Sequence, residues 1–450
     1  MTLLLSVAAL LPRLLLGFCI VHFLWSAVDG KSFLVKIFLS AGIGFGLSSL
    51  FSFLWIWAGL PLSIYAILES LIAIVLAVIV FFYNRPLFTF KHTSDKTNTI
   101  WALLLAFGFF LFVVNFLLLA RQHPHGLSDA WINWNVVARF ISLGGADWQN
   151  TFRRQLDHPD YPLYLAMTNA VTWSLIREPS TWGPVAFHFV NTFFTAGLLF
   201  SLVNRFRDFK QAALATLIFI SLPFTIGQGI RQYADMLLAQ LILAAGGLML
   251  LYLQTKETRF ALLAGLFIGL AGWAKNEGIV TSIGFTALWT LIATKADRQS
   301  LKNYLIGLAF PFVVVILYKL FLAPSNDLLS AQGNLSEKIL DAKRYEVIVK
   351  QALVTSWNLG GAPLSLFGII ILTTLVLGRS LHRIPGLWML PAVIGIQLAA
   401  YFGTYLITPQ DLPWHLSTSL DRLYLHVFPL ALCWFFLWLR SPEELSSKES

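Results

Sequence analysis

The segment 121–161 concentrates the residue types that acid–base chemistry needs. It holds four aspartates, four arginines and four tryptophan or tyrosine rings, between stretches that are mostly apolar. Asp129 stands shortly after one apolar run, and a carboxylate at the mouth of a membrane cavity can accept a proton from a hydroxyl group. Its alternative role is to cap a helix N-terminus. Trp131 and Trp134 are expected to share one helix face, as anchors at the membrane interface or as platforms for sugar stacking.

The motif LDHPDYP carries a second group of polar side chains. Asp157, His158 and Asp160 fall within four positions, and Pro159 and Pro162 prevent a continuous helix there. Two carboxylates and an imidazole can bind a divalent cation, which makes Asp157 and Asp160 candidate metal ligands. A solvated loop is the alternative.

A third group lies in GQGIRQYADM, at the start of an apolar run. The guanidinium of Arg231 offers several fixed donors to phosphate oxygens, beside Tyr233 and Asp235. In the alternative interpretation, Asp235 is a helix N-cap and Arg231 only neutralises it.

The fourth group, in GWAKNEG, consists of Lys275, Asn276 and Glu277 between two apolar runs. Ionisable groups in that position are costly unless they are paired or functional. The alternative is a tight turn in which Lys275 and Glu277 reach back to the membrane surface.

A fifth group precedes the last apolar run and includes His415, Asp421 and Arg422. An arginine at a helix start opposes the helix dipole, which suggests an external anion. A simple ion pair between Asp421 and Arg422 is the alternative.

The composition decides where these groups must be placed. The chain is 57% hydrophobic and 12% charged, with a mean hydropathy of +0.73, values that exclude an ordinary soluble protein. The net charge of +9 comes mainly from short connections between apolar runs, so membrane topology explains it better than nucleic-acid binding. Cys19 and Cys433 both lie inside apolar runs and indicate neither a disulfide framework nor a thiolate metal site.

The hydropathy pattern predicts an all-α, polytopic transmembrane bundle of about thirteen spans. The runs are 3–27, 33–60, 61–83, 100–120, 183–204, 211–227, 234–253, 260–274, 278–294, 304–322, 363–378, 386–407 and 422–439.

The distribution of lysine and arginine predicts which connections face outward. The basic segments 205–210 and 379–383 are placed inside, and the N-terminus outside. This alternation requires that the run 161–176 does not cross, so it is expected to be a juxtamembrane helix at the outer interface. The predicted outer segments are 121–182, 228–233, 275–277, 323–361 and 408–421, and residues 441–450 form a solvated cytoplasmic tail. Within 323–361, the amphipathic stretch SEKILDAKRYEVIVKQAL is expected to form a lid or platform on the outer surface.

Several of these motifs together resemble the GT-C superfamily of polytopic glycosyltransferases. They are the early outer-loop aspartate, HPDYPL, YAD before a span, the KNEG turn and the stretch TPQDLPWHLSTSLDR. The likeness is greatest to the Rgt-type lipopolysaccharide glycosyltransferases and the lipid A aminoarabinose transferase, with protein O-mannosyltransferases as more general relatives. It covers residues 100–440 as a catalytic core, and residues 1–99 look like additional N-terminal transmembrane helices.

The resemblance implies transfer of a sugar from a polyprenyl-phosphate donor to a hydroxyl group of a glycolipid, glycan or protein. It places the reaction on the extracytoplasmic face of a bacterial inner membrane, with inversion at the anomeric carbon. By position Asp129 is the catalytic base. The family commonly has an adjacent acidic pair, whereas Ala130 follows Asp129 here, so Asp157 or Asp160 would supply a second carboxylate.

The remaining candidates are assigned to the donor phosphate or to its surroundings. Fixed cations in a partly dry site stabilise a departing phosphate. The expected phosphate contacts are Arg231, Lys275, Arg422 and His158, and further site candidates are Asp157, Asp160, Tyr233, Asp235, Asn276, Glu277, His415 and Asp421. No cofactor is required, a divalent metal is an option, and the expected partners are the lipid-linked donor, the acceptor and membrane lipids, without nucleic acid.

Three other functional classes stay open at this point. A transporter or flippase of lipid-linked sugars would also combine many spans with charged residues, although no inverted repeat is visible. An oligosaccharide polymerase or ligase would use similar substrates, and would be expected to rely on arginine and histidine in one large outer loop. A structural scaffold would leave the aspartate and KNEG groups without a purpose.

Overall fold

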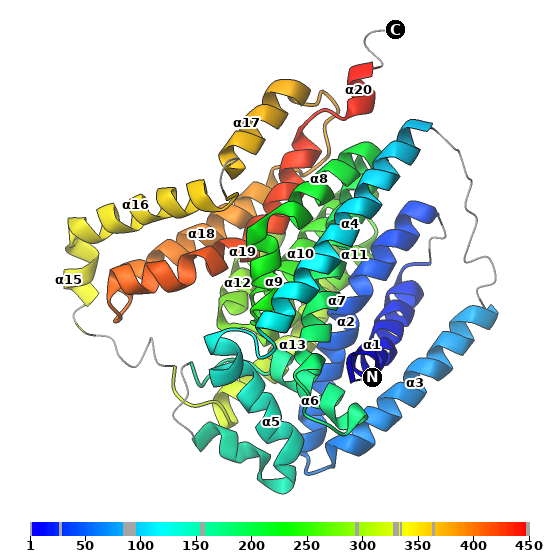
Figure 1. Ribbon diagram of the computed structural model, residues 1–450, viewed down its shortest axis with the longest axis vertical. Helices are drawn as coiled ribbons and strands as arrows, with labels where there is room; N and C mark the ends of the chain where they lie inside the picture. The colour runs from blue at the N-terminus through cyan, green and yellow to red at the C-terminus, as the bar shows by residue number, and fades with distance from the viewer. Residues whose placement is uncertain are drawn as a thin grey trace.

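The computed structural model describes residues 2–26, 29–83, 96–153, 158–292, 297–326, 333, 335–361 and 365–446. Within these ranges the regular secondary structure is helical, apart from a single β-bridge between Arg379 and Leu439. The prediction of an all-α fold is therefore confirmed. Figure 1 shows long helices that run between two ends of the molecule, with α5 and α6 at one end and α20 with the C-terminus at the other.

The helices are the following. They are α1 (Thr2–Leu24), α2 (Gly30–Trp57), α3 (Leu62–Tyr83), α4 (Lys96–Gln122), the π-helix η1 (Ala130–Trp134), α5 (Asn135–Leu143), the 3-10 helix η2 (Gly145–Arg153), α6 (Tyr164–Ile176), α7 (Trp182–Phe206), α8 (Phe209–Ser221), α9 (Pro223–Ile230), α10 (Asp235–Thr255), α11 (Thr258–Ala274), α12 (Asn276–Ile292), α13 (Arg298–Phe321), α15 (Leu335–Leu340), α16 (Ala342–Asn358), α17 (Leu366–Leu377), α18 (Met389–Ile407), α19 (Leu412–Trp438) and α20 (Pro442–Ser446).

Nine helices of the described ranges are long and apolar enough to cross a membrane: α1, α2, α3, α4, α7, α10, α13, α18 and α19. Helices α8 and α9 are together long and apolar enough to form one further span, with a bend of 62° between them. The described ranges then contain up to ten candidate membrane spans. The bend falls where Pro223 opens α9, because proline cannot continue the hydrogen bonding of α8. The other predicted spans fold as α11, α12 and α17, which have 17, 17 and 12 residues.

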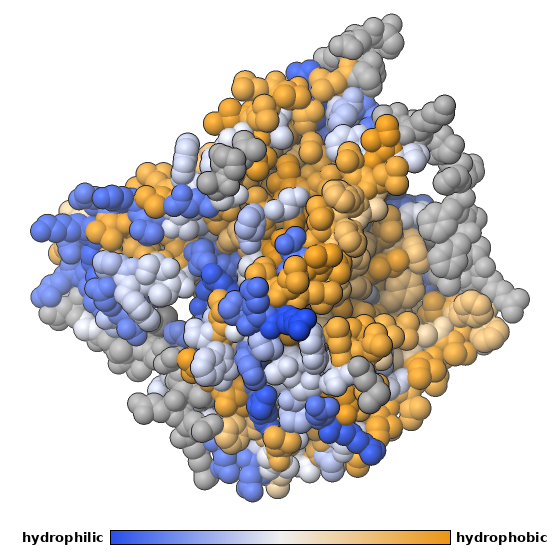
Figure 2. Space-filling model, viewed as in Figure 1, coloured by the Kyte–Doolittle hydropathy of each residue, from blue (hydrophilic) through white to orange (hydrophobic). Residues whose placement is uncertain are grey.

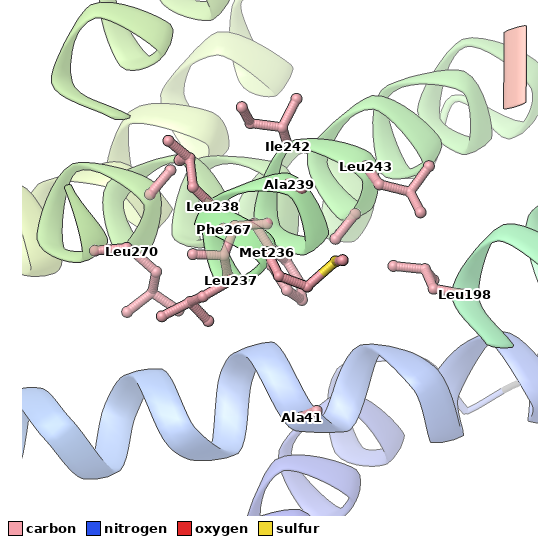
Figure 3. Packing of buried hydrophobic residues seen from close by; sticks show 14 of the residues in the cluster. Ala41, Leu198, Met236, Leu237, Leu238, Ala239, Ile242, Leu243, Phe267 and Leu270 are labelled. Carbon is pink, nitrogen blue, oxygen red and sulfur yellow. The ribbon is translucent and has the colours of Figure 1, made fainter. Parts of the chain in front are cut away.

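Helix α10 forms the centre of the bundle. Of its most apolar stretch 94% is buried, compared with 11% for α4 at the periphery. Figure 3 shows Met236, Leu237 and Leu243 of α10 among side chains from α2, α7 and α11. A helix that is apolar on every side belongs in such an interior. The outer face over α3 and α4 is also apolar, whereas hydrophilic residues gather over α15 and α16 (Figure 2).

The basic connections predicted to lie inside meet at one end of the bundle. Arg207 contacts the carboxylate of Glu444 at 3.1 Å, and Ser380 donates to the same carboxylate at 3.0 Å. The segments 205–210, 379–383 and the start of the tail therefore share one surface, as the sidedness prediction requires. The tail is not simply solvated, because α20 docks on this surface; residues 447–450 lie outside the described ranges.

Helix α6, predicted to be a juxtamembrane helix that does not cross, packs into the bundle. Its polar residues Thr168, Asn169 and Thr172 are fully buried. Arg13 of α1 donates to the carbonyl oxygen of Thr168 and to Oγ1 of Thr172, each at 2.9 Å. These polar residues therefore make internal hydrogen bonds instead of facing solvent. With 13 residues α6 is too short to span a bilayer core of about 30 Å.

Helices α11 and α13 approach each other closely through glycines. A methyl group on Gly265 would overlap the carbonyl oxygen of Tyr304, and one on Gly307 would overlap that of Leu262. Small residues permit such backbone contact between membrane helices. This contact holds the end of α13 beside the start of α12.

We expect Gly265→Ala to lower the melting temperature of the purified protein, because the added methyl group forces the two backbones apart at a cost of about 1–3 kcal/mol. Gly395→Ala in α18 is the matched control, since nothing lies within 4 Å of its added methyl group. Thermal unfolding in detergent compares the two variants. Equal melting temperatures would show that the α11–α13 contact is not tight.

Candidate active site

The buried carboxylate of Asp235 is the centre of the site. Its Oδ1 lies 2.8 Å from Nζ of Lys275 and 2.7 Å from Nε2 of His426, and its Oδ2 accepts from Nε of Arg422 at 3.2 Å. The side chain is 2% exposed. Asp235 is the first residue of α10, and its predicted alternative role as N-cap is wrong, because Ala234 holds that position.

Arg422 joins Asp235 to Asp129. Its Nη1 donates to Oδ2 of Asp129 at 2.6 Å, and its guanidinium lies over the ring of Tyr233 at 4.5 Å. Asp129 does occupy the N-cap position of η1, but its carboxylate makes no cap hydrogen bond there and pairs with Arg422 instead. The pairing of Arg422 with Asp421 through their side chains is also wrong: Asp421 pairs with Arg231 at 3.0 Å instead.

Tyr233 fixes the backbone that carries Asp129. The amide N–H of Asp129 donates to the hydroxyl of Tyr233 at 3.3 Å, and Oγ of Ser128 lies 3.4 Å from the same oxygen. Burial raises the pKa of Tyr233, so its phenol stays neutral at ordinary pH. The π-helix η1 begins at the next residue, and such helices are frequent at functional sites.

The π-helix also separates the two tryptophans that were expected to share a face. Trp131 is 60% exposed, whereas Trp134 is 3% exposed and stacks on Tyr161 with ring centroids 5.1 Å apart. The prediction was wrong because the spacing of an α-helix does not apply to this segment. Only Trp131 is placed to act as an interfacial anchor.

The KNEG turn brings a cation between two carboxylates. Nζ of Lys275 lies 2.8 Å from both Asp235 and Glu277, and its side chain is 2% exposed. The idea that Lys275 reaches back to the membrane surface was therefore wrong. Together Asp129, Asp235, Lys275, Glu277, Arg422 and His426 form what we call the Asp235 cluster.

Asp160 belongs to a second group beside the Asp235 cluster. Its Oδ2 accepts from Nζ of Lys319 at 2.7 Å, from Nδ2 of Asn276 at 3.0 Å and from Nδ2 of Asn326 at 2.9 Å. Asn276 follows Lys275 directly, so the KNEG turn contributes to both groups.

The donors around Oδ2 of Asp160 disfavour a divalent cation at that oxygen, whereas its buried Oδ1 has no hydrogen-bond partner in the described structure. Three N–H groups, one of them a charged ammonium, already surround its Oδ2, and a metal ion would be repelled by them. In the described part of the chain, no three His, Cys, Asp or Glu side chains are placed to hold a metal ion. The other predicted ligand, Asp157, lies outside the described residues.

Tyr161 lies between the LDHPDYP segment and the Asp235 cluster. Its ring centroid is 5.5 Å from Nζ of Lys275 and 5.0 Å from the ring of His158. Burial raises the pKa of Tyr161 well above its ordinary value. His158 is therefore beside the cluster, with Tyr161 as its neighbour.

The remaining site residues predicted from the sequence, Arg231, Asp421 and His415, lie outside the Asp235 cluster. Arg231 and Asp421 form a partly exposed pair, with side chains 26% and 29% exposed, and Gln228 donates to the same carboxylate at 2.9 Å. Nδ1 of His415 is 2.9 Å from Oγ1 of Thr408, at the corner between α18 and α19.

Two important residues were not predicted from the sequence. Lys319, at the end of α13, resembles any basic residue at the end of a span. His426 lies inside the last apolar run, four positions after Arg422, and that spacing on a helix places both side chains on one face. This spacing was a usable signal. The hydroxyl of Tyr401 in α18 lies 2.6 Å from Nδ1 of His426.

Comparisons with known proteins returned no match: no family model, no curated protein sequence and no solved structure is similar to this chain at a significant level. The chemistry of the site and the motifs of the sequence are therefore what indicates a function.

We expect Asp235→Asn to destabilise the protein by about 3–5 kcal/mol, because Lys275 and Arg422 lose their buried counter-charge. Asp421→Asn is the control and should cost about 1 kcal/mol or less, because its pair with Arg231 is partly exposed. The free energy of unfolding in mixed micelles measures both. Similar small losses would contradict a central role for Asp235.

Proposed function

We propose that this integral membrane protein is an inverting glycosyltransferase. It moves a sugar from a polyprenyl-phosphate donor to a hydroxyl acceptor, on the extracytoplasmic side of a bacterial inner membrane. The observation that carries the proposal is the bridge from Asp129 through Arg422 to buried Asp235, since it unites three separately identified motifs. The GT-C-like order of those motifs along the chain supports the same reading.

Exposure separates the roles of the two aspartates. The side chain of Asp129 is 26% exposed, so an acceptor hydroxyl can reach it. The side chain of Asp235 is only 2% exposed and cannot be reached without a rearrangement of the protein. We assign Asp129 as the general base. Asp235 is a positioning residue that holds Arg422 and Lys275.

The charges of the Asp235 cluster nearly cancel. It contains three carboxylates, of Asp129, Asp235 and Glu277, and two permanent cations, Lys275 and Arg422. No cation in it is free to attract an anion, so a donor phosphate has to compete with Asp129 for Arg422. The bidentate guanidinium suits that exchange. Arg231 at the edge is the second candidate contact, whereas buried Lys275 is held by its two carboxylates.

This exchange also prepares the base. While Arg422 contacts Asp129, its guanidinium occupies the carboxylate oxygen Oδ2 that would otherwise be open to the acceptor hydroxyl. Transfer of the guanidinium to the phosphate uncovers Asp129 and places the cation where negative charge develops. Donor binding and base activation are thereby coupled.

The reaction then balances without a further reactant. The acceptor hydroxyl gives its proton to Asp129, and its oxygen forms a bond to the anomeric carbon. The bond between that carbon and the phosphate oxygen breaks, and polyprenyl phosphate leaves with the electron pair from the opposite face. Configuration at the anomeric carbon is inverted.

A transporter of lipid-linked sugars is the second candidate. The break between α8 and α9, followed by Arg231, resembles the discontinuous helices around transporter binding sites. The two functions differ in their product, because a transporter moves the lipid-linked sugar across the membrane without breaking the glycosidic bond.

Asp129→Asn should fold and insert normally but lose about 10²–10⁴-fold in transfer rate, because the amide cannot accept the proton. Sugar transfer from a radiolabelled polyprenyl-phosphate donor in proteoliposomes measures this loss. Asp147→Asn, an exposed carboxylate in the same outer segment, is the control and should retain activity. Wild-type turnover by Asp129→Asn would remove the assignment of the base.

Arg422→Ala should raise the KM for the lipid donor at least about tenfold more than the KM for the acceptor, since a charged hydrogen bond is worth about 1.5–3 kcal/mol. Steady-state kinetics with each substrate varied in turn provides the measurement. Equal effects on the two constants would indicate that Arg422 is only a structural partner of Asp129 and Asp235.

A further inference from the structure

His426 and Tyr401 form a chain of hydrogen bonds behind Asp235 that the proposed reaction does not use. Nε2 of His426 lies 2.7 Å from Oδ1 of Asp235, and Nδ1 of the same ring lies 2.6 Å from the hydroxyl of Tyr401. His426 and Tyr401 are 0% and 5% exposed, so bulk water does not compete for these contacts. Each ring nitrogen of this buried histidine therefore has a protein partner.

The chain joins three helices of the bundle. Asp235 is the first residue of α10, Tyr401 belongs to α18 and His426 to α19, and α10 and α18 both pack against α19. Arg422 precedes His426 by about one turn of α19, so the two side chains share one face. Nε of Arg422 donates to Oδ2 of Asp235 at 3.2 Å. Helix α19 thus contacts both oxygens of the Asp235 carboxylate, one through each side chain.

The amide of Gln397 in α18 extends the chain to the KNEG turn. Gln397 is 1% exposed, and its side chain forms a hydrogen bond with Tyr401. Its Nε2 also donates to the carbonyl oxygen of Glu277 at 3.3 Å. Lys275 contacts Glu277 and Asp235, each at 2.8 Å. These contacts close a ring that connects α10, α12, α18 and α19 behind the Asp235 cluster.

The partners of His426 determine where its ring hydrogen lies. Asp235, paired with Lys275 and Arg422, is an ionised carboxylate that can only accept. Nε2 of His426 must therefore carry a hydrogen. Two permanent cations already contact Asp235, and a neutral imidazole supplies a further donor without adding a third. Nδ1 is then a bare acceptor, and the hydroxyl of Tyr401 donates to it.

We propose that His426 and Tyr401 are positioning residues for sugar transfer, a role that rests on the proposed function. Tyr401 holds the imidazole ring through Nδ1, and the ring holds Oδ1 of Asp235. Oδ2 of Asp235 therefore keeps facing Nε of Arg422. None of these contacts involves Asp129, so they persist when Nη1 of Arg422 leaves Asp129 for the donor phosphate. Asp235 thereby anchors one end of a guanidinium whose other end changes partner.

Nitrogen NMR of the full-length protein in lipid nanodiscs tests the hydrogen-bond chain. Histidine is isotope-labelled, and His426→Gln identifies the resonances of His426 by their absence. At neutral pH the wild type should carry a hydrogen on Nε2 and none on Nδ1. In Tyr401→Phe the Nδ1 resonance should move toward that of an imidazole nitrogen without a donor. A hydrogen on Nδ1 in the wild type would overturn the proposal.

Steady-state kinetics in proteoliposomes tests the consequence for the donor. Tyr401→Phe should raise the KM for the polyprenyl-phosphate donor about three- to tenfold, the worth of one hydrogen bond. Its kcat should not change, because Asp129 keeps its place.

Tyr405→Phe is the matched control for Tyr401→Phe. Tyr405 is also in α18, is 1% exposed, and has its hydroxyl 2.7 Å from Oγ of Ser419. Both variants lose one hydrogen bond of a buried tyrosine, so their melting temperatures should fall alike. The bond lost in Tyr405→Phe does not lead to Asp235, so its donor KM and its Nδ1 resonance of His426 should match the wild type.

Two further results would overturn the positioning role. They are an equal donor KM in Tyr401→Phe and Tyr405→Phe, and an Nδ1 resonance of His426 that Tyr401→Phe leaves unchanged. A wild-type protein without transfer activity would instead contradict the proposed function. That failure is recognised separately, because the resonance is measured without donor or acceptor.

Discussion

The ion pairs of Arg422 determine the organisation of the end of the bundle at which α10 begins. One guanidinium contacts Asp235, which is buried at the start of the central helix, and Asp129, which is partly exposed in the segment after α4. An isolated charge is too costly in this environment, so each member keeps the others in place. The arrangement combines a rigid, buried half with an accessible half, which is what a site for charged substrates requires.

Topology explains why such distant segments meet. Helices α10 and α12 begin at this end of the bundle and α11 and α13 finish there, so these turns of the chain bring polar groups together. Arg422 was predicted at a helix start, and this was wrong: α19 begins at Leu412, so Arg422 extends from the interior of a helix. Asn276 and Lys275 are adjacent, and they join the Asp160 group to the Asp235 cluster. A shift of the KNEG turn would therefore disturb both groups at once. The close contact of α11 with α13 provides the stiffness that this turn needs.

Much of this arrangement follows from the sequence, and the exceptions have physical reasons. The all-helical fold and the meeting of Asp129, Arg422 and Lys275 around Asp235 could be anticipated, because polar residues beside apolar runs gather at the same membrane surface. The carboxylates with which Arg422 pairs could not be anticipated. The side chain of Arg422 pairs with Asp235 and Asp129, which are 187 and 293 positions away, and not with its neighbour Asp421. The packing of α10 against α19 determines this choice.

Buried polar residues within apolar runs were the hardest to anticipate. His426, Lys319 and Glu69 look like isolated exceptions in spans, and their partners are defined only in three dimensions. The burial of helix α6 could not be anticipated for a related reason, because Thr168 and Thr172 accept hydrogen bonds from the distant Arg13. The number of spans also depends on the short helices α11, α12 and α17, whose lengths hydropathy alone does not give.

The most direct test of the account is an experimental structure of the protein in lipid nanodiscs with polyprenyl phosphate bound. The decisive quantity is the distance from the guanidinium of Arg422 to the phosphate and to Asp129. The account predicts that Arg422 contacts the phosphate and has left Asp129, while its contact with Asp235 is retained. A phosphate bound elsewhere, with the pair of Arg422 and Asp129 intact at 2.6 Å, would contradict it.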